Sequence, residues 1–188
     1  MSIEKRIKEY SGLSLPELEN NQFSRTNIKY CIYATCISCL TWLFFKIFYP
    51  YPNLTFDSYH YLMNMHLNTN AAGWPVGYSK FIRFLGHFSH SANLLTTIQF
   101  FATQLGFLFF FLTFRIIFKP TNWASNIIFI FLIINPINVF NSNHVLSDPL
   151  YLGVSMVWIS QVLWIIFRFK PYMIITQAIL LFVLFDLR

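Results

Sequence analysis

Residues Ala92 to Phe114 read ANLLTTIQFFATQLGFLFFFLTF and contain no charged side chain. A helix rises ~1.5 Å per residue, so this run is long enough to cross roughly 30 Å of hydrocarbon. Similar apolar runs occupy residues 30–48, 124–140, 149–167 and 172–187. The sequence therefore predicts an all-α fold, a polytopic transmembrane helix bundle of about five helices within residues 30–188.

The composition indicates the same class of protein. Of the residues, 56% are hydrophobic and 11% are charged, whereas soluble domains carry roughly 25% charged residues. The net charge of +6 comes from basic residues in short loops, which is typical of membrane topology and forms no continuous nucleic-acid surface. We expect membrane lipid, and no nucleic acid, as a partner. Cys31, Cys36 and Cys39 lack metal-ligand spacing and are interpreted as packing residues.

The positions of Lys and Arg predict the orientation, because basic residues near helix ends are retained in the cytoplasm. Nine of the 13 lie before residue 30, between 115 and 119, or between 168 and 170. Residues 1–29 are then a cytoplasmic segment, and residues 49–91 and 141–148 are exterior. We expect a multi-pass protein of the plasma membrane, the inner membrane in a bacterium, with a cytoplasmic N-terminus.

The last apolar run is short. It ends at Phe185, before Asp186, and offers roughly 21 Å of helix against the ~30 Å to be crossed. Either the bilayer thins there or the chain once continued beyond Arg188. We favour the second explanation, so we expect an incomplete last helix and a missing C-terminal portion of the same protein as a partner.

The exterior loop, residues 49–91, contains two segments with helical periodicity. In the second, apolar and basic side chains form separate stripes: Phe81, Phe84, Leu85 and Phe88 on one, and Lys80, Arg83 and His87 on the other. This pattern predicts an interfacial helix that can meet lipid phosphates. Residues 57–65 predict another such helix, with the turn Gly73-Trp74-Pro75-Val76-Gly77 between them.

Only two carboxylates, Asp57 and Asp148, occur between Glu19 and the last three residues. An acid at the edge of hydrocarbon is a functional candidate, because burying an unpaired carboxylate costs several kcal/mol. Asp148 ends a polar cluster that includes His144. Because Ser147 or Asp148 followed by Pro149 is also a good helix start, capping is an equal alternative for Asp148.

The order of these features resembles the GT-C superfamily of polytopic membrane glycosyltransferases, which includes protein mannosyltransferases and the aminoarabinose transferase of lipid A. The matching residues are Asp57, Tyr61, Trp74-Pro75-Val76-Gly77-Tyr78, Asn135-Pro136 and Leu146-Ser147-Asp148-Pro149-Leu150-Tyr151. Asn135-Pro136 is expected to end or kink the third long helix. Two features depart from the family. Phe56 and Ser58 stand where many relatives carry a second acid, and full members have many more helices.

The resemblance implies transfer of a sugar from a polyprenyl-phosphate donor to an exterior-facing acceptor. Such a transfer needs a base near the acceptor and positive charge near the departing phosphate. Asp57 is the catalytic candidate, and the substrate-binding candidates are Tyr61, Lys80, Arg83, His87, His144 and Asp148. The cofactor is unknown. A divalent metal is one candidate, but nothing in the sequence fixes a third ligand beside His87 and His90.

A small non-enzymatic multispan protein is the alternative. Its amphipathic loop would be a platform for lipid or a partner, with Asp148 as a cap and Asp57 paired with Lys80 or Arg83. A transporter is disfavoured, because paired helices broken by Gly or Pro are missing.

Overall fold

The computed structural model describes residues 25–68 and 75–188. Within these ranges every regular element is a helix and no strand occurs, which confirms the predicted all-α class. The helices are α3 (Arg25–Phe48), α4 (Phe56–Leu67), α5 (Gly77–Gly86), α6 (Ala92–Phe118), α7 (Asn122–Ile133), α8 (Pro136–Ser142), α9 (Asp148–Phe167) and α10 (Tyr172–Leu187).

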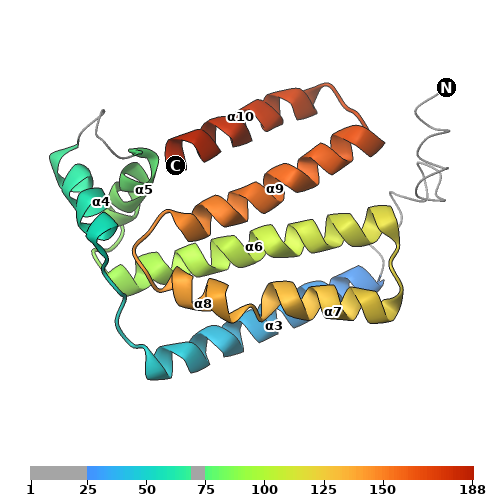
Figure 1. The fold of residues 1–188 in the computed structure, drawn as a ribbon, viewed down its shortest axis with the longest axis horizontal. Coiled ribbons are helices and arrows are strands. Elements are labelled where there is room, and N and C mark those ends of the chain that lie inside the picture. Colours follow the sequence, from blue (N-terminus) through green and yellow to red (C-terminus); the bar gives the residue numbers. More distant parts are fainter. Residues whose placement is uncertain (1–24, 69–74) are drawn as a thin grey trace.

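The long helices run along the longest axis of the molecule, and α4 and α5 gather at one end (Figure 1). We call this the α4–α5 end. The C-terminus of the chain lies at the same end, whereas α3 begins at the opposite one (Figure 1). Helix α6 is central, because it packs against α3, α7, α8 and α9, and α10 packs on the far side of α9.

Four helical segments of the described chain are long and apolar enough to cross a membrane. They are Arg25–Phe48, Ala92–Phe118, Asn122–Ser142 (α7 with α8) and Asp148–Phe167. The fifth, α10, has 16 residues and is shorter. This is the arrangement expected of a multi-pass membrane protein.

Two helix boundaries differ from the predicted ones by more than two residues. Helix α3 begins at Arg25, inside the predicted segment 1–29, because the bundle continues to support it there: Asn27 is buried and its amide oxygen accepts a hydrogen bond from Arg115. Helix α6 extends beyond residue 114 to Phe118. It ends where Lys119 adopts a left-handed conformation (φ 45°) ahead of Pro120, a common way for a helix to terminate.

The third apolar run is interrupted at Asn135-Pro136, as predicted. Pro136 has no N–H to continue the helix, and the Asn135 side chain accepts hydrogen bonds from the amides of Ile137 (3.0 Å) and Asn138 (3.4 Å). The run therefore forms two helices, α7 and α8, instead of one.

The predicted loop helices are also present, as α4 and α5. Helix α5 is amphipathic: Tyr78, Ser79 and Ile82 are buried, whereas Lys80 and Arg83 are exposed. A core cluster holds this end together by joining α4, α5, α6, α9 and α10, through Tyr61, Tyr78, Ile82, Leu95, Val145, Leu150 and Leu187. The two loop helices are thus part of the packed fold. Their position at the membrane interface stays a prediction.

Candidate functional site

A buried hydrogen-bond network lies beneath α4 and α5. The Tyr78 hydroxyl donates to the Gln99 side-chain oxygen (2.8 Å), and the Gln99 amide donates to the backbone carbonyls of Ser142 (3.1 Å) and His144 (2.9 Å). These carbonyls lie where the chain leaves α8 before α9, so they have no helical partner. Gln99 on α6 satisfies them and fixes the α8–α9 connection against α5.

Tyr61 of α4 packs beside this network. It is 5% exposed, its hydroxyl lies 3.0 Å from the Ser147 hydroxyl, and its ring packs edge-on against Tyr78 at 4.8 Å. Burial, with Tyr61 beside it, raises the pKa of Tyr78, so Tyr78 keeps its proton and remains a donor. Tyr61 therefore positions α4 against the start of α9, and its hydroxyl points into the core.

The segment between α3 and α4 is hydrogen-bonded to the α8–α9 connection. Asn53 donates its amide to the Asn143 carbonyl (2.9 Å), and its own carbonyl accepts from Val145 (3.1 Å). The Asn143 side chain donates to the Tyr51 carbonyl and accepts from Lys46 (2.6 Å). Residues 49–55 thus cross the end of the bundle in a fixed position.

A groove opens beside this network, between α4, α5 and the first turns of α6. Its volume is about 520 Å³, within the usual range for small-molecule sites. Its walls are largely aliphatic and include Leu54, Leu62, Met65, Ile82, Leu85, Leu94, Leu95 and Val145.

The polar part of the groove is basic. Arg83 lines it from α5, His66 from the last turn of α4, and His87 and His90 from the turn that leads to α6. No carboxylate occurs among the described residues that line it. An apolar groove that is lined by basic groups and by no described acid is suited to a ligand that has a hydrocarbon part and an anionic head.

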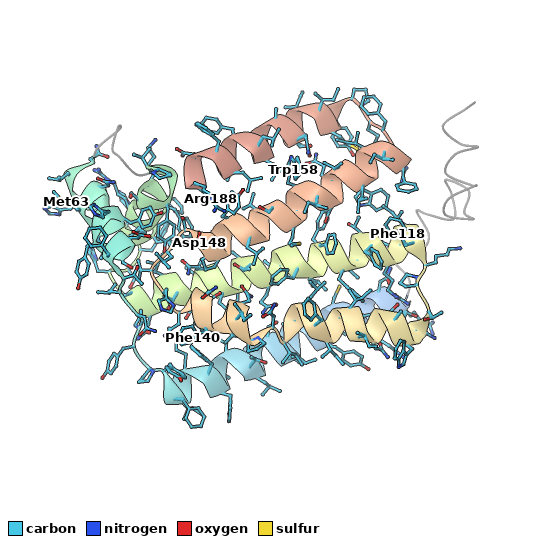
Figure 2. All side chains as sticks on the ribbon, viewed as in Figure 1. Met63, Phe118, Phe140, Asp148, Trp158 and Arg188 are labelled. Carbon is cyan, nitrogen blue, oxygen red and sulfur yellow. The ribbon has the colours of Figure 1, made fainter. Side chains whose placement is uncertain are left out.

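The structure brings together only some of the predicted site residues. Arg83 and His87 share the groove, whereas Lys80 is exposed on α5 and does not line it. His144 is partly buried, and its ring nitrogen Nδ1 lies 3.1 Å from the Phe140 carbonyl. Asp148 is exposed in the first turn of α9, at the α4–α5 end (Figure 2).

Asp57 lies in the first turn of α4 and is partly exposed. It is not a lining residue of the groove, but the spacing of four residues places it on the same helix face as Tyr61 and Met65. Met65 lines the groove about two turns away, or ~12 Å along the helix axis. Within the described residues, no ion pair joins Asp57 to Lys80 or Arg83.

The other predictions for these segments have mixed outcomes. Ser147 is the residue before α9, but its side chain makes no cap hydrogen bond there, because it faces Tyr61 instead. In the part of the chain that the structure describes, no three His, Cys, Asp or Glu side chains gather as a metal site. Trp74, which belongs to the proposed turn, lies outside the described residues.

His66 was not identified as a site residue from the sequence, and His90 was considered only as a metal ligand. His66 follows Leu62 by four residues, so helical periodicity places both on one face of α4. This spacing was a signal in the sequence that could have identified His66. The contribution of Leu54 and Val145 could not be found in this way, because the contacts between residues 49–55 and the α8–α9 connection bring them to the groove.

No protein family model, no curated protein and no solved structure matches this chain.

Proposed function

We propose that the groove binds the phosphate of a membrane lipid, and that the chain acts as a glycosyltransferase that takes its sugar from a polyprenyl-phosphate donor. The observation that carries the proposal is the composition of the groove. Aliphatic walls are joined to a basic edge formed by Arg83, His66, His87 and His90. A phosphate needs such donors, and the adjoining lipid chain needs such walls.

Arg83 is the main phosphate ligand in this proposal. Its guanidinium is permanently charged and planar, so it can donate two parallel hydrogen bonds to phosphate oxygens. When the bond between sugar and phosphate breaks, negative charge grows on the phosphate oxygen that leaves. Positive charge held beside that oxygen stabilises the transition state more than the ground state.

Asp57 is the proposed base for the acceptor hydroxyl. It lies in the first turn of α4, ~12 Å along the helix from the groove-lining residue Met65. This separation leaves room for a sugar between the phosphate and the carboxylate. The attack then forms the new glycosidic bond, the acceptor proton moves to the Asp57 carboxylate, and the lipid phosphate leaves with the electron pair.

Binding is tested with two variants on the same helix. Arg83→Gln removes the cation that lines the groove, whereas Lys80→Gln removes an exposed cation of α5 that does not line it. With the protein in zwitterionic nanodiscs, we expect Arg83→Gln to weaken polyprenyl phosphate binding roughly tenfold or more. We expect Lys80→Gln to bind like the wild type. Equal loss in both variants would show only a general charge effect and would contradict the proposed site.

Catalysis is tested with Asp57→Asn. In membranes that contain the protein and a polyprenyl-phosphate sugar, the variant should lose sugar transfer and keep the wild-type amount of folded protein. An active, stable Asn variant would remove Asp57 from the chemistry.

A non-enzymatic lipid-binding protein is the second candidate, and one observation favours it. Asp57 occupies the first turn of α4, where the helix dipole stabilises a carboxylate without any chemistry. In that case Asp57→Asn lowers the stability of the protein, while the groove still binds lipid phosphate.

A further inference from the structure

The basic groups of the groove are of two kinds. Arg83 carries a permanent charge, whereas His66, His87 and His90 are imidazoles, the side chains that gain or lose charge between about pH 5 and 8. A lipid phosphodiester carries one negative charge throughout that range, because it has no second ionisation. At alkaline pH only the permanent positive charge of Arg83 offsets the negative charge of the phosphodiester.

The described residues that line the groove include no acid that would cancel a positive charge. Asp186 of α10 lies against Gly77, at the opposite end of α5 from His87. Among the described lining residues, α4 contributes His66, α5 contributes Arg83, and the turn before α6 contributes His87 and His90. The described lining residues of α6, of the segment before α4 and of the α8–α9 connection are uncharged. A proton gained by an imidazole therefore adds to the net positive charge that an anionic ligand meets.

The geometry of His87 shows how one such proton would act. Its Nδ1 lies 2.9 Å from the Arg83 carbonyl oxygen, and a carbonyl only accepts, so Nδ1 carries the hydrogen. In the neutral ring Nε2 is then an acceptor and offers nothing to a phosphate oxygen. Protonation converts Nε2 into a charged donor without disturbing the bond to Arg83.

His66 and His87 share a second property. His66 lies in the last turn of α4 and His87 is the C-cap residue of α5. The partial negative charge at a helix C-terminus interacts favourably with a cation at these positions. All three imidazoles are exposed, so protons reach them from solvent.

We infer that the groove is a pH-dependent anion site, which holds a lipid phosphodiester more tightly when His66, His87 and His90 are protonated. The inference rests on the proposed function, because it concerns the same groove and the same phosphate. It adds that acidification retains the lipid and that a neutral or alkaline medium releases it.

The test uses a probe whose own charge does not change. Dihexanoyl phosphatidylglycerol is a phosphodiester with one negative charge, and its Kd is measured at about pH 8 and about pH 5.5. The full chain is held in phosphatidylcholine nanodiscs, and empty nanodiscs provide the baseline. We expect roughly tenfold tighter binding at the lower pH, from three added charge pairs.

Three variants locate the effect. The combined variant His66→Gln, His87→Gln and His90→Gln should lose the tightening at low pH. His60→Gln, on α4 but outside the described lining of the groove, should keep it. Arg83→Gln should weaken binding at both values, which tests the proposed function separately. A thermal unfolding scan of each variant confirms that it is folded.

The outcomes distinguish the two claims. Binding that depends on Arg83 but has the same Kd at both values overturns this inference and leaves the proposed function standing. Tightening that survives the triple substitution also overturns it. If the wild-type protein binds no probe at either value, the proposed function fails and this inference fails with it.

Discussion

At the scale of single residues, two glycines bring α6 and α9 into direct backbone contact. A Cβ atom added at Gly153 would lie 2.8 Å from the Thr103 Cα, and one added at Gly106 would meet the Gly153 backbone. Close approach of this kind allows good packing between helices in lipid, where the hydrophobic effect does not press them together.

We predict that Gly153→Ala destabilises the bundle by about 1–3 kcal/mol, because the added methyl group must push apart two backbones. The measurement is the thermal unfolding midpoint in detergent. Gly86→Ala is the matched control, since an added Cβ there meets nothing within 4 Å. A Gly153→Ala variant as stable as Gly86→Ala would mean that α6 and α9 are not packed as described.

A second residue-scale prediction concerns Gln99. Gln99→Leu leaves the Tyr78 hydroxyl and the Ser142 carbonyl without their described partner, at a cost of about 2–4 kcal/mol. The His144 carbonyl loses one bond but still accepts from the Leu146 amide (2.9 Å). Chemical unfolding of the purified protein measures the change.

The control for this prediction is Gln177→Leu on α10. The Gln177 side-chain oxygen is buried without a hydrogen-bond partner among the described residues. The same substitution should therefore be neutral or slightly stabilising there. Equal losses in the two variants would show that glutamine size, not the network, matters.

At the scale of helices, the break between α7 and α8 leaves a carbonyl to be satisfied. The Gln104 amide on α6 donates to the Ile133 carbonyl (3.2 Å) at the last residue of α7. Broken helices are tolerated inside a membrane where a neighbouring helix supplies such a partner. Helix α6 supplies such partners twice, because Gln99 donates to carbonyls of the α8–α9 connection and Gln104 donates to the Ile133 carbonyl.

We predict that Gln104→Leu loosens the α7–α8 break with little change in global stability. The substitution removes the bond to Ile133, but it also removes a buried side-chain oxygen of Gln104 that has no partner among the described residues, and the two effects oppose each other. Hydrogen exchange should become faster at the amides of Ile137 and Asn138. Unchanged exchange there would argue that Gln104 does not support the break.

At the scale of the whole molecule, the groove and the C-terminus share the α4–α5 end, and the loop between α6 and α7 lies at the other (Figure 1). Phe118 marks that opposite end of α6 (Figure 2). The proposed donor chemistry needs the α4–α5 end to face the exterior, which is also the orientation predicted from the basic residues.

Single cysteines test this orientation, in a background in which Cys31, Cys36 and Cys39 are replaced by Ala. We predict that Lys80→Cys reacts with a membrane-impermeant maleimide in intact cells, and that Lys119→Cys reacts only after permeabilisation, because both side chains are exposed but at opposite ends. Mass shift on a gel measures the labelling. The reverse pattern would invert the topology.

Properties of residues that are close in the sequence were sufficient to predict several features of the fold. The length of the apolar runs predicted the long helices, and proline without an N–H predicted the break at Asn135-Pro136. The helical spacing of basic and apolar residues from Lys80 to Phe88 predicted a helix there, and α5 (Gly77–Gly86) covers most of that range. Each of these signals depends on neighbours within a few turns, and the sequence displays such neighbours directly.

The candidate site was only partly visible in the sequence. Arg83 and His87 were identified from their stripe on one helix, and the structure places both in the groove. Tyr61 was expected at the substrate but lies in the core, because its hydroxyl meets Ser147, 86 residues later in the chain. No local pattern could reveal that pairing.

By itself, then, the sequence determined the helical membrane class, the positions of the long helices and the cationic stripe of α5, because hydrophobic length and periodicity are properties of contiguous residues. Only the tertiary structure decided which side chains form the groove. Leu54, His66, Arg83 and Val145 meet there because backbone bonds of Asn53 and the side chain of Gln99 hold distant segments together. Contacts between distant segments depend on packing of the whole bundle, which periodicity does not encode.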